Sequence, residues 1–277
     1  MERLEVQAGD YVFQARAAGP PDGRLVLLLH GFPQSSFEWR HQLQALGDAG
    51  YRAVAPDQRG YSPGARPHGI EQYRVQHLVA DVLAIADVQG ALRFDLVGHD
   101  WGAAVAWQLA GRHPERLRSL TIVSVPHPAA FEGALRGESD QAQRSSYVDF
   151  FRQEGSEETF VADGGAGLRN LFAVTGLADC DEYVDLLLQP GAMKAALNWY
   201  RAMSIGALEG MGPVTTPTLY VWSDQDQALG REAAEATAGH VRGPYRFEVL
   251  EGIGHWIPEH APERLSDLLL EHLRATG

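Results

Sequence analysis

The sequence predicts an α/β protein with a mostly parallel central sheet flanked by helices and a helical cap inserted after the sixth strand. Short, continuously apolar runs alternate with segments whose apolar residues recur at helical spacing, a pattern typical of parallel strands joined by right-handed crossovers. That alternation stops near residue 128 and resumes near residue 211. The chain has 277 residues, of which 45% are hydrophobic, so it is long enough for one large core.

The elements of this core follow in chain order. Alternating apolar and polar residues over 4–15 predict an edge hairpin. Continuously apolar runs predict buried parallel strands at 25–29 and 53–55, and mainly apolar runs predict further strands from 94 to the turn at 100 and at 120–125, 218–222 and 246–250. Helical spacing predicts helices over 37–49, 72–88, 101–112, 231–238 and 262–273.

The middle of the chain predicts the cap. No buried strand is recognisable over 129–210, and helical spacing recurs at 140–153, 157–160, 167–172, 180–188 and 191–202. The predicted division is therefore a core of 1–128 and 211–277 with a cap of 129–210. Ligands of open α/β sheets bind beyond the carboxyl ends of the strands. We expect the cap to cover a site at that edge.

Composition and charge restrict the classes of partner. The formal net charge is −13 and the sequence pI is about 5.2, which argues against binding to nucleic acid or to an anionic membrane. Cys180 is the only cysteine, so no internal disulfide is possible. Residues 1–16 are charged and alternating, unlike a secretion signal, and no apolar run approaches the roughly 20 residues that span a bilayer. These features predict a cytoplasmic protein and leave a homodimer possible.

The most informative residue is Asp100, at the point where a buried strand turns sharply into a helix. Small residues at 98, 102 and 103 suit a nucleophile elbow, whose apex is held in strained backbone geometry. Serine is the usual occupant. A carboxylate there changes the chemistry from acyl transfer to attack on an alkyl carbon, with an ester to the enzyme as intermediate. An ordinary turn with an N-capping aspartate would explain Asp100 alone.

Two further residues complete a candidate triad in the order nucleophile, acid, histidine. His255 lies in a glycine-bordered loop after the last predicted strand, where it could activate the water that cleaves the ester. Asp226 follows the strand at 218–222 and is the candidate that orients His255, with Asp224 as its rival. The backbone N–H groups of Phe32 and Trp101 are candidates for the oxyanion hole.

Several of these motifs resemble soluble epoxide hydrolases of the α/β-hydrolase superfamily. The resemblance is carried by His-Gly-Phe-Pro-Gln-Ser-Ser-Phe-Glu-Trp-Arg at 30–40, Asp-Gln-Arg-Gly-Tyr at 57–61, Gly-His-Asp-Trp-Gly at 98–102 and Gly-His-Trp at 254–256. It implies the α/β-hydrolase fold and a small-molecule epoxide substrate. Neither a metal nor an organic cofactor is needed for the chemistry that it implies.

The predicted cap contributes a second part of the resemblance. Leu-Asn-Trp-Tyr-Arg-Ala at 197–202 is similar to the lid motif in which a tyrosine, here Tyr200, donates a hydrogen bond to the epoxide oxygen. The family generally uses two such tyrosines. Aligning 147–153 puts Phe150 at the position of the first, with Tyr147 one helical turn earlier as a possible second donor. The residues expected to line the substrate pocket are Phe32, Trp101, Phe150, Trp199 and Trp256.

The resulting hypothesis is a two-step hydrolysis. Asp100 attacks an epoxide carbon while Tyr200 stabilises the alkoxide, and water activated by His255 then releases a vicinal diol. One alternative is a haloalkane or haloacid dehalogenase with the same triad, which would need halide donors such as Trp101 and Trp199. Phe32 occupies the position where some dehalogenases carry an asparagine. Another alternative is a ligand-binding protein that has lost turnover on the same scaffold.

Overall fold

The computed structural model describes residues 1–203 and 210–277, and it confirms the predicted fold class. One eight-stranded sheet has the order β1-β2-β4-β3-β5-β6-β7-β8. The β1-β2 hairpin is antiparallel, β2 is antiparallel to β4, and all the other pairs are parallel. The strands are β1 (Glu2–Ala8), β2 (Tyr11–Ala18), β3 (Leu25–Leu29), β4 (Arg52–Pro56), β5 (Phe94–His99), β6 (Leu117–Val123), β7 (Thr218–Ser223) and β8 (Tyr245–Leu250).

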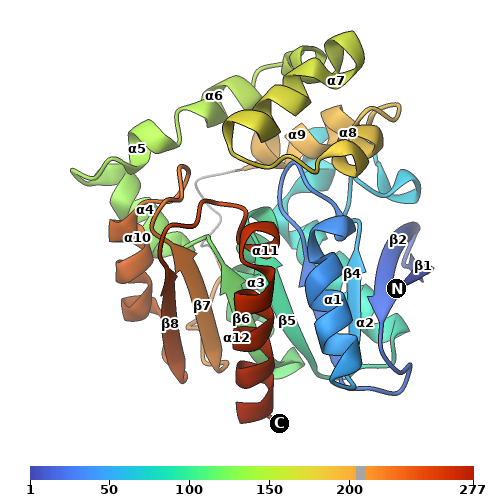
Figure 1. Cartoon of the computed structure of the whole chain (residues 1–277), viewed down its shortest axis with the longest axis vertical. Helices are drawn as coiled ribbons and strands as arrows, with labels where there is room; N and C mark the ends of the chain where they lie inside the picture. Colours follow the sequence, from blue (N-terminus) through green and yellow to red (C-terminus); the bar gives the residue numbers. More distant parts are fainter. Residues whose placement is uncertain (204–209) are drawn as a thin grey trace.

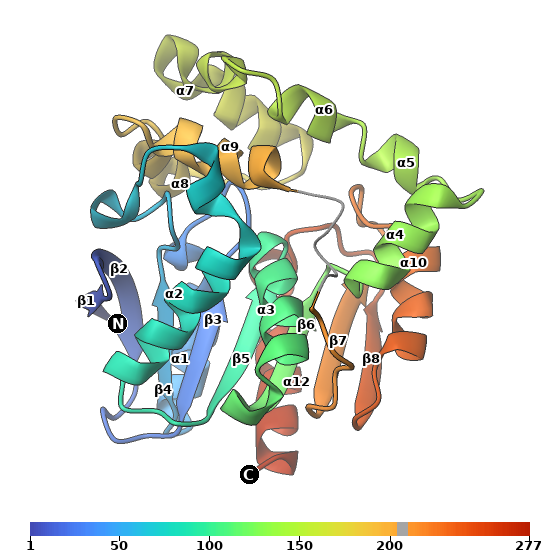
Figure 2. The same ribbon diagram turned by 180° about the vertical axis from the view of Figure 1, so that it is seen from behind.

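Helices cover both faces of the sheet because successive strand side chains point to opposite faces. Val26 and Leu28 of β3 pack in one apolar cluster with α1 and α12, whereas Leu27 and Leu29 pack in another with α2 and α3 (Figures 1 and 2). The helices of the core are α1 (Arg40–Asp48), α2 (Val75–Val88), α3 (Trp101–Arg112), α10 (Arg231–Ala236), α11 (Ile257–His260) and α12 (Pro262–Ala275), with 3-10 turns η1 (Ser36–Trp39), η2 (Pro63–Ala65), η3 (Ile70–Tyr73), η4 (Pro114–Arg116) and η6 (Thr237–His240).

Helices joined by loops make up most of the described chain between β6 and β7. Figures 1 and 2 show α5 to α9 arching over the sheet edge at which β5 ends and α3 begins. These cap helices are α4 (Pro128–Arg136), α5 (Gln141–Arg144), α6 (Tyr147–Phe151), α7 (Ser156–Val174), α8 (Asp181–Leu187) and α9 (Ala192–Ala202). Residues 204–209 of the predicted cap lie outside the described part of the chain, and the division at 128/129 and 210/211 stays a prediction.

Three local predictions need correction. The single helix expected over 140–153 is two short helices, α5 and α6. The segments expected at 157–160 and 167–172 belong to α7, which is kinked where residues 162–165 leave helical geometry. The sixth strand ends at Val123 rather than at 125, because Ser124 adopts a φ of 70° that a strand cannot continue. Helix α4 was not predicted.

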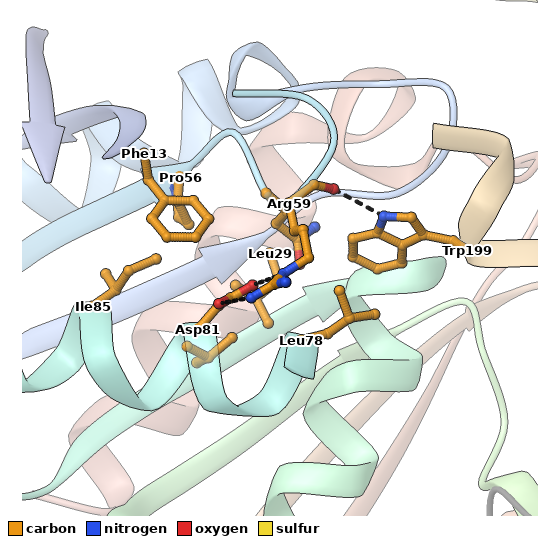
Figure 3. Close-up of a pocket in the computed structure, with 10 residues that line it drawn as sticks. Phe13, Leu29, Pro56, Arg59, Leu78, Asp81, Ile85 and Trp199 are labelled. Atoms are coloured by element: carbon orange, nitrogen blue, oxygen red, sulfur yellow. Dashed lines mark hydrogen bonds and ion pairs between the residues drawn. The ribbon is translucent and has the colours of Figure 1, made fainter. Parts of the chain in front are cut away.

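The cap is fastened to the core beneath α9. The indole N–H of Trp199 donates a 2.9 Å hydrogen bond to the backbone carbonyl of Arg59. The guanidinium of Arg59 in turn forms a bidentate ion pair with Asp81 of α2, with both N–H···O distances at 2.6 Å (Figure 3). These groups border a small cavity under α9. The side chains of Arg59 and Asp81 are almost fully buried, and two hydrogen bonds join them. This ion pair makes a rigid support for the cap.

Within residues 1–203 and 210–277, no helix is long and apolar enough to cross a membrane. No three His, Cys, Asp or Glu side chains in the same ranges come together in a group that could hold a metal ion.

Candidate active site

The backbone around Asp100 has the geometry of a nucleophile elbow. Asp100 has φ 49° and ψ −118°, a strained conformation for a residue with a side chain, and it precedes the first residue of α3. Glycines allow neighbouring segments to approach closely. A Cβ added to Gly102 would lie 2.1 Å from the carbonyl oxygen of Leu29, and one added to Gly31 would lie 2.4 Å from Cβ of Asp100. The small residues expected at this turn are therefore required by contact with adjacent chain.

The strand register brings the ends of three strands together at this turn. Leu29 pairs with Gly98, and His99 pairs with Val123. The segments that follow β3, β5 and β6 therefore leave the sheet side by side. Phe32 comes from the first of these segments, and Asp100 from the second.

The carboxylate of Asp100 has two different neighbours. Its Oδ1 accepts a 2.8 Å hydrogen bond from the N–H of Phe32, and its Oδ2 lies 3.5 Å from Nε2 of His255. Burial opposes ionisation, but the hydrogen bond and charge of His255 outweigh it and hold the pKa of Asp100 below its usual value. Trp101 is the first residue of α3, so the helix itself leaves its N–H without a partner. The two N–H groups expected to form the oxyanion hole, those of Phe32 and Trp101, therefore lie next to Asp100.

Asp226 contacts the histidine, whereas Asp224 does not. Oδ2 of Asp226 lies 2.8 Å from Nδ1 of His255, and its Oδ1 accepts hydrogen bonds from the N–H groups of Ala228 at 2.8 Å and Leu229 at 3.0 Å. Asp224 instead accepts a bond from a loop backbone N–H. Burial lowers the pKa of His255, but the charges and hydrogen bonds of the two carboxylates raise it well above its usual value. The histidine therefore holds its proton while both carboxylates are ionised.

Tyr200 of α9 stands over the elbow. Its side chain is buried, and its ring centroid lies 5.0 Å from that of Trp101 and 5.2 Å from that of Phe32. Burial first, and then the negative charge of Asp100, raise the pKa of the hydroxyl well above its usual value. The phenol therefore stays protonated and available as a hydrogen-bond donor beside the carboxylate.

Tyr147 of α6 reaches the same space from the other side of the cap. The residue as a whole is 37% exposed, but the surroundings of its hydroxyl raise its pKa, through burial first and then through the charges of Asp100 and Asp226. Tyr147 also contributes to the raised pKa of Tyr200. Its ring packs 5.1 Å from that of Phe151, which in turn packs 5.1 Å from that of Tyr200. Phe150 is 38% exposed and contacts other cap phenylalanines.

The other two residues expected to line the pocket, Trp199 and Trp256, make different contacts. The ring of Trp199 packs 5.7 Å from Trp101, but its indole N–H is occupied by the carbonyl of Arg59. Trp256 is buried with its ring 5.0 Å from that of His255. Phe151 lies among the aromatic residues above the elbow, with its ring 5.2 Å from that of Phe32 and 5.1 Å from that of Tyr200. The sequence places Phe151 in an aromatic group that is either core or pocket wall, because spacing alone does not separate the two.

Comparison with known proteins decides the family. The α/β-hydrolase fold family matches residues 24–262. The chain belongs to the α/β-hydrolase family. This α/β-hydrolase is 36% identical over 277 residues to the AB hydrolase superfamily protein YfhM of Bacillus subtilis, with 97% of this chain and 96% of that protein covered. It is 31% identical to Epoxide hydrolase A of Mycobacterium tuberculosis, with 92% of each chain covered.

Solved structures agree with these relatives. The crystal structure of an epoxide hydrolase from Bacillus megaterium in complex with an inhibitor superposes with a TM-score of 0.89 at 26% identity, covering 98% of this chain and 100% of that one. Epoxide Hydrolase A from Mycobacterium thermoresistibile gives a TM-score of 0.85 at 30% identity, covering 99% and 98%. The protein is therefore an epoxide-hydrolase-like member of the α/β-hydrolases, and a hydrolase enzyme.

Proposed function

We propose that this α/β-hydrolase converts epoxides to vicinal diols through a covalent ester on Asp100. The observation that carries the proposal is a carboxylate at the nucleophile elbow, 3.5 Å from His255, with the ring of Tyr200 packed against Trp101 and Phe32 beside it. Ring opening needs both groups at once, because the epoxide carbon accepts the nucleophile while its oxygen gains negative charge. Relatives and structural neighbours named as epoxide hydrolases support the same reaction class.

In the first step, Asp100 attacks an epoxide carbon and the ring C–O bond breaks. The N–H of Phe32 binds Oδ1, so Oδ2 is the oxygen free to attack. Tyr200, with Tyr147 as second donor, hydrogen-bonds the departing oxygen and supplies its proton, and the resulting phenolate then takes up the proton that His255 held at rest. The step leaves an ester between Oδ2 of Asp100 and the substrate carbon.

In the second step, His255 takes a proton from a water molecule, and the resulting hydroxide attacks the ester carbonyl carbon of Asp100. The N–H groups of Phe32 and Trp101 stabilise the oxyanion, which collapses by breaking the bond between the carbonyl carbon and Oδ2. The diol leaves, and the carboxylate of Asp100 is restored. Asp226 holds the ring of His255 in the orientation that this step needs.

The electrostatics link the two steps. The negative charge and hydrogen bond of Asp100 contribute to the raised pKa of His255. Alkylation turns the carboxylate of Asp100 into a neutral ester, so both contributions disappear and the pKa of His255 falls. The histidine therefore becomes able to act as a base once the ester exists.

A dehalogenase is the second candidate because it would use the same triad. A departing halide needs N–H donors around it, and the indole N–H of Trp199 is already bonded to a backbone carbonyl. Hydroxyl donors from Tyr200 and Tyr147 suit an alkoxide that must gain a proton. These contacts favour the epoxide reaction.

The test is intact-mass spectrometry of the wild type and of His255→Gln after mixing with styrene oxide and, separately, with 1-bromobutane. We expect His255→Gln to accumulate an adduct of one styrene oxide on Asp100, and only the wild type to release the diol. An adduct from the bromide alone would move the assignment to a dehalogenase. No adduct from either compound, with no diol from the wild type, would contradict the proposed function.

A further inference from the structure

Behind the triad lie two fully buried groups that the mechanism does not use. Glu38 of η1 and His99 of β5 are both 0% exposed, and Oε1 of Glu38 lies 3.1 Å from Nδ1 of His99. The other carboxyl oxygen of Glu38 accepts a 3.1 Å hydrogen bond from the N–H of Gly31. On its far side, Nε2 of His99 lies 3.0 Å from the backbone carbonyl oxygen of His255.

The position of the protons follows from these contacts. A carbonyl oxygen only accepts, so Nε2 of His99 carries the hydrogen that binds His255. Nδ1 then faces Glu38 either as an acceptor from a neutral carboxylic acid or as the donor of an ion pair. Full burial disfavours two charges, and a cationic His99 would sit 4.9 Å, ring to ring, from His255, which is itself protonated at rest. The neutral pair is the arrangement that fits.

The directions of the pKa shifts agree with this arrangement. Burial, with the nearby charge of Asp100, raises the pKa of Glu38 well above its usual value, although its bond from Gly31 opposes the change. Burial and then the charge of His255 lower the pKa of His99 to about 4. Both directions favour the uncharged forms, a neutral acid at Glu38 and a neutral imidazole at His99.

A second donor binds the same carbonyl. The hydroxyl of Ser124 donates a 3.2 Å hydrogen bond to the carbonyl oxygen of His255. Ser124 has a φ of 70°, one of three positive values among the non-glycine residues described. Its strained backbone is fixed by bonds from Tyr220 to its carbonyl and from its N–H to Val221. Strain held in place at the end of a strand is typical of a residue with a positioning role.

We propose that Glu38, as a neutral carboxylic acid, positions both halves of the ester-hydrolysis machinery. Through Gly31 it fixes the loop that carries the Phe32 N–H, and through His99 it fixes the backbone of His255, which Ser124 holds from a third strand. Glu38, His99 and Ser124 are positioning residues, since none of them reaches Asp100 or the substrate. The inference rests on the proposed two-step reaction and concerns its second step.

Two substitutions of Glu38 separate a neutral acid from an ion pair. Glu38→Gln keeps the acceptor for the N–H of Gly31 and places an amide N–H beside Nδ1 of His99, at the 3.1 Å contact that the acid now makes. Glu38→Leu removes both and leaves two buried polar groups unpaired. We expect Glu38→Leu to slow ester hydrolysis about tenfold, a typical effect of losing an outer-shell partner, while alkylation stays within about twofold of wild type. We expect Glu38→Gln to stay within about threefold, with the wild-type pH profile.

The measurement is single-turnover rapid quench with styrene oxide, in which mass spectrometry follows the ester on Asp100 and chromatography follows the diol. Accumulation of ester in Glu38→Leu but not in Glu38→Gln supports the inference. Equal slowing of hydrolysis in both variants means that Glu38 works as an anion, which overturns it. Equal slowing of alkylation and hydrolysis in Glu38→Leu means a merely structural role, which also overturns it.

A second pair of variants keeps the test decisive if Glu38→Leu does not fold. Ser124→Ala removes one donor to the His255 carbonyl, and Ser119→Ala removes a similar buried serine bond on the same strand, to Asp95. We expect slower ester hydrolysis only in Ser124→Ala, by about threefold, and an unchanged rate in Ser124→Ala overturns the positioning role. His255→Gln serves as the reference throughout, because absence of ester in that variant would refute the proposed function instead.

Discussion

Asp226→Asn is the substitution whose consequence the structure fixes most tightly. Oδ1 of Asp226 accepts hydrogen bonds from two backbone N–H groups, those of Ala228 and Leu229. The side-chain oxygen of the asparagine must take the place of Oδ1, because its NH₂ group would otherwise face these two N–H donors. Its NH₂ group then points at Nδ1 of His255, which must accept. The proton of the neutral imidazole moves to Nε2, and the nitrogen that should deprotonate water no longer can.

The expected loss in the rate of ester hydrolysis follows from the free energy needed to restore the tautomer of His255 that can deprotonate water. Turning the amide over would leave two buried N–H groups unpaired, at about 1–3 kcal/mol each. A total of about 2–6 kcal/mol corresponds to a loss of about 30-fold to 10⁴-fold in the hydrolysis rate constant. Alkylation needs only the carboxylate of Asp100 and the cap tyrosines, so we expect it to change by less than about tenfold. The ester should therefore accumulate.

The assay is rapid quench with styrene oxide, with the ester and the diol measured at each time point. Asp224→Asn is the matched control, because the same change two residues earlier affects only a bond to the N–H of Gly252. We expect wild-type turnover from that control. Diol release by Asp226→Asn within about tenfold of wild type would refute the tautomer argument, because even the lower bound of the calculated range exceeds it.

Three further predictions concern the cap and a buried acid. Tyr200→Phe and Tyr147→Phe should each lower the single-turnover alkylation rate by about 10- to 100-fold without changing hydrolysis of the ester, and equal slowing of both steps would contradict their role as donors. The pKa of Glu259 is raised to about 7, chiefly by burial. Folding then favours its protonated form, so stability is present below pH 4.5 and is lost as pH rises towards 7. Glu259→Gln should gain up to about 3 kcal/mol of unfolding free energy over wild type between pH 5 and 8 in urea titrations, and a pH-independent difference would refute this. Trp199→Phe, which leaves the carbonyl of Arg59 without its donor, should lower the unfolding free energy by about 1–3 kcal/mol, and a value unchanged in urea would show that this bond does not fasten the cap.

The sheet and the order of the triad could be predicted because each depends on local sequence. Continuous apolar runs are sufficient to predict buried parallel strands. Glycines around Asp100 and His255 indicate turns at which neighbouring segments of the chain approach closely. The sequence left Asp226 and Asp224 as rivals because both follow the same strand. The structure separates them by contact, since Oδ2 of Asp226 reaches His255 and Asp224 binds the backbone of Gly252.

Long-range contacts account for what the sequence could not predict. Trp199 belongs to a motif typical of a lid, yet its N–H is used by the core, a pairing that depends on how α9 is placed. His99 is the last residue of β5, directly before the elbow. Its partner Glu38 lies on η1, and no spacing rule connects a 3-10 turn with a strand end. The break between α5 and α6 likewise follows from tertiary packing, which overrides helical periodicity in short segments.

The charge state of the buried acid behind the triad has a consequence for the whole cycle. His255 must be protonated beside the ionised Asp100 and must lose that proton once Asp100 becomes an ester. This switch works only if no other anion keeps the histidine charged. Glu38 interacts electrostatically with His255, so an ionised Glu38 would hold the proton on the histidine after alkylation and suppress hydrolysis. A neutral Glu38 adds no such charge, so alkylation of Asp100 is itself the event that lowers the pKa of His255 and creates the base.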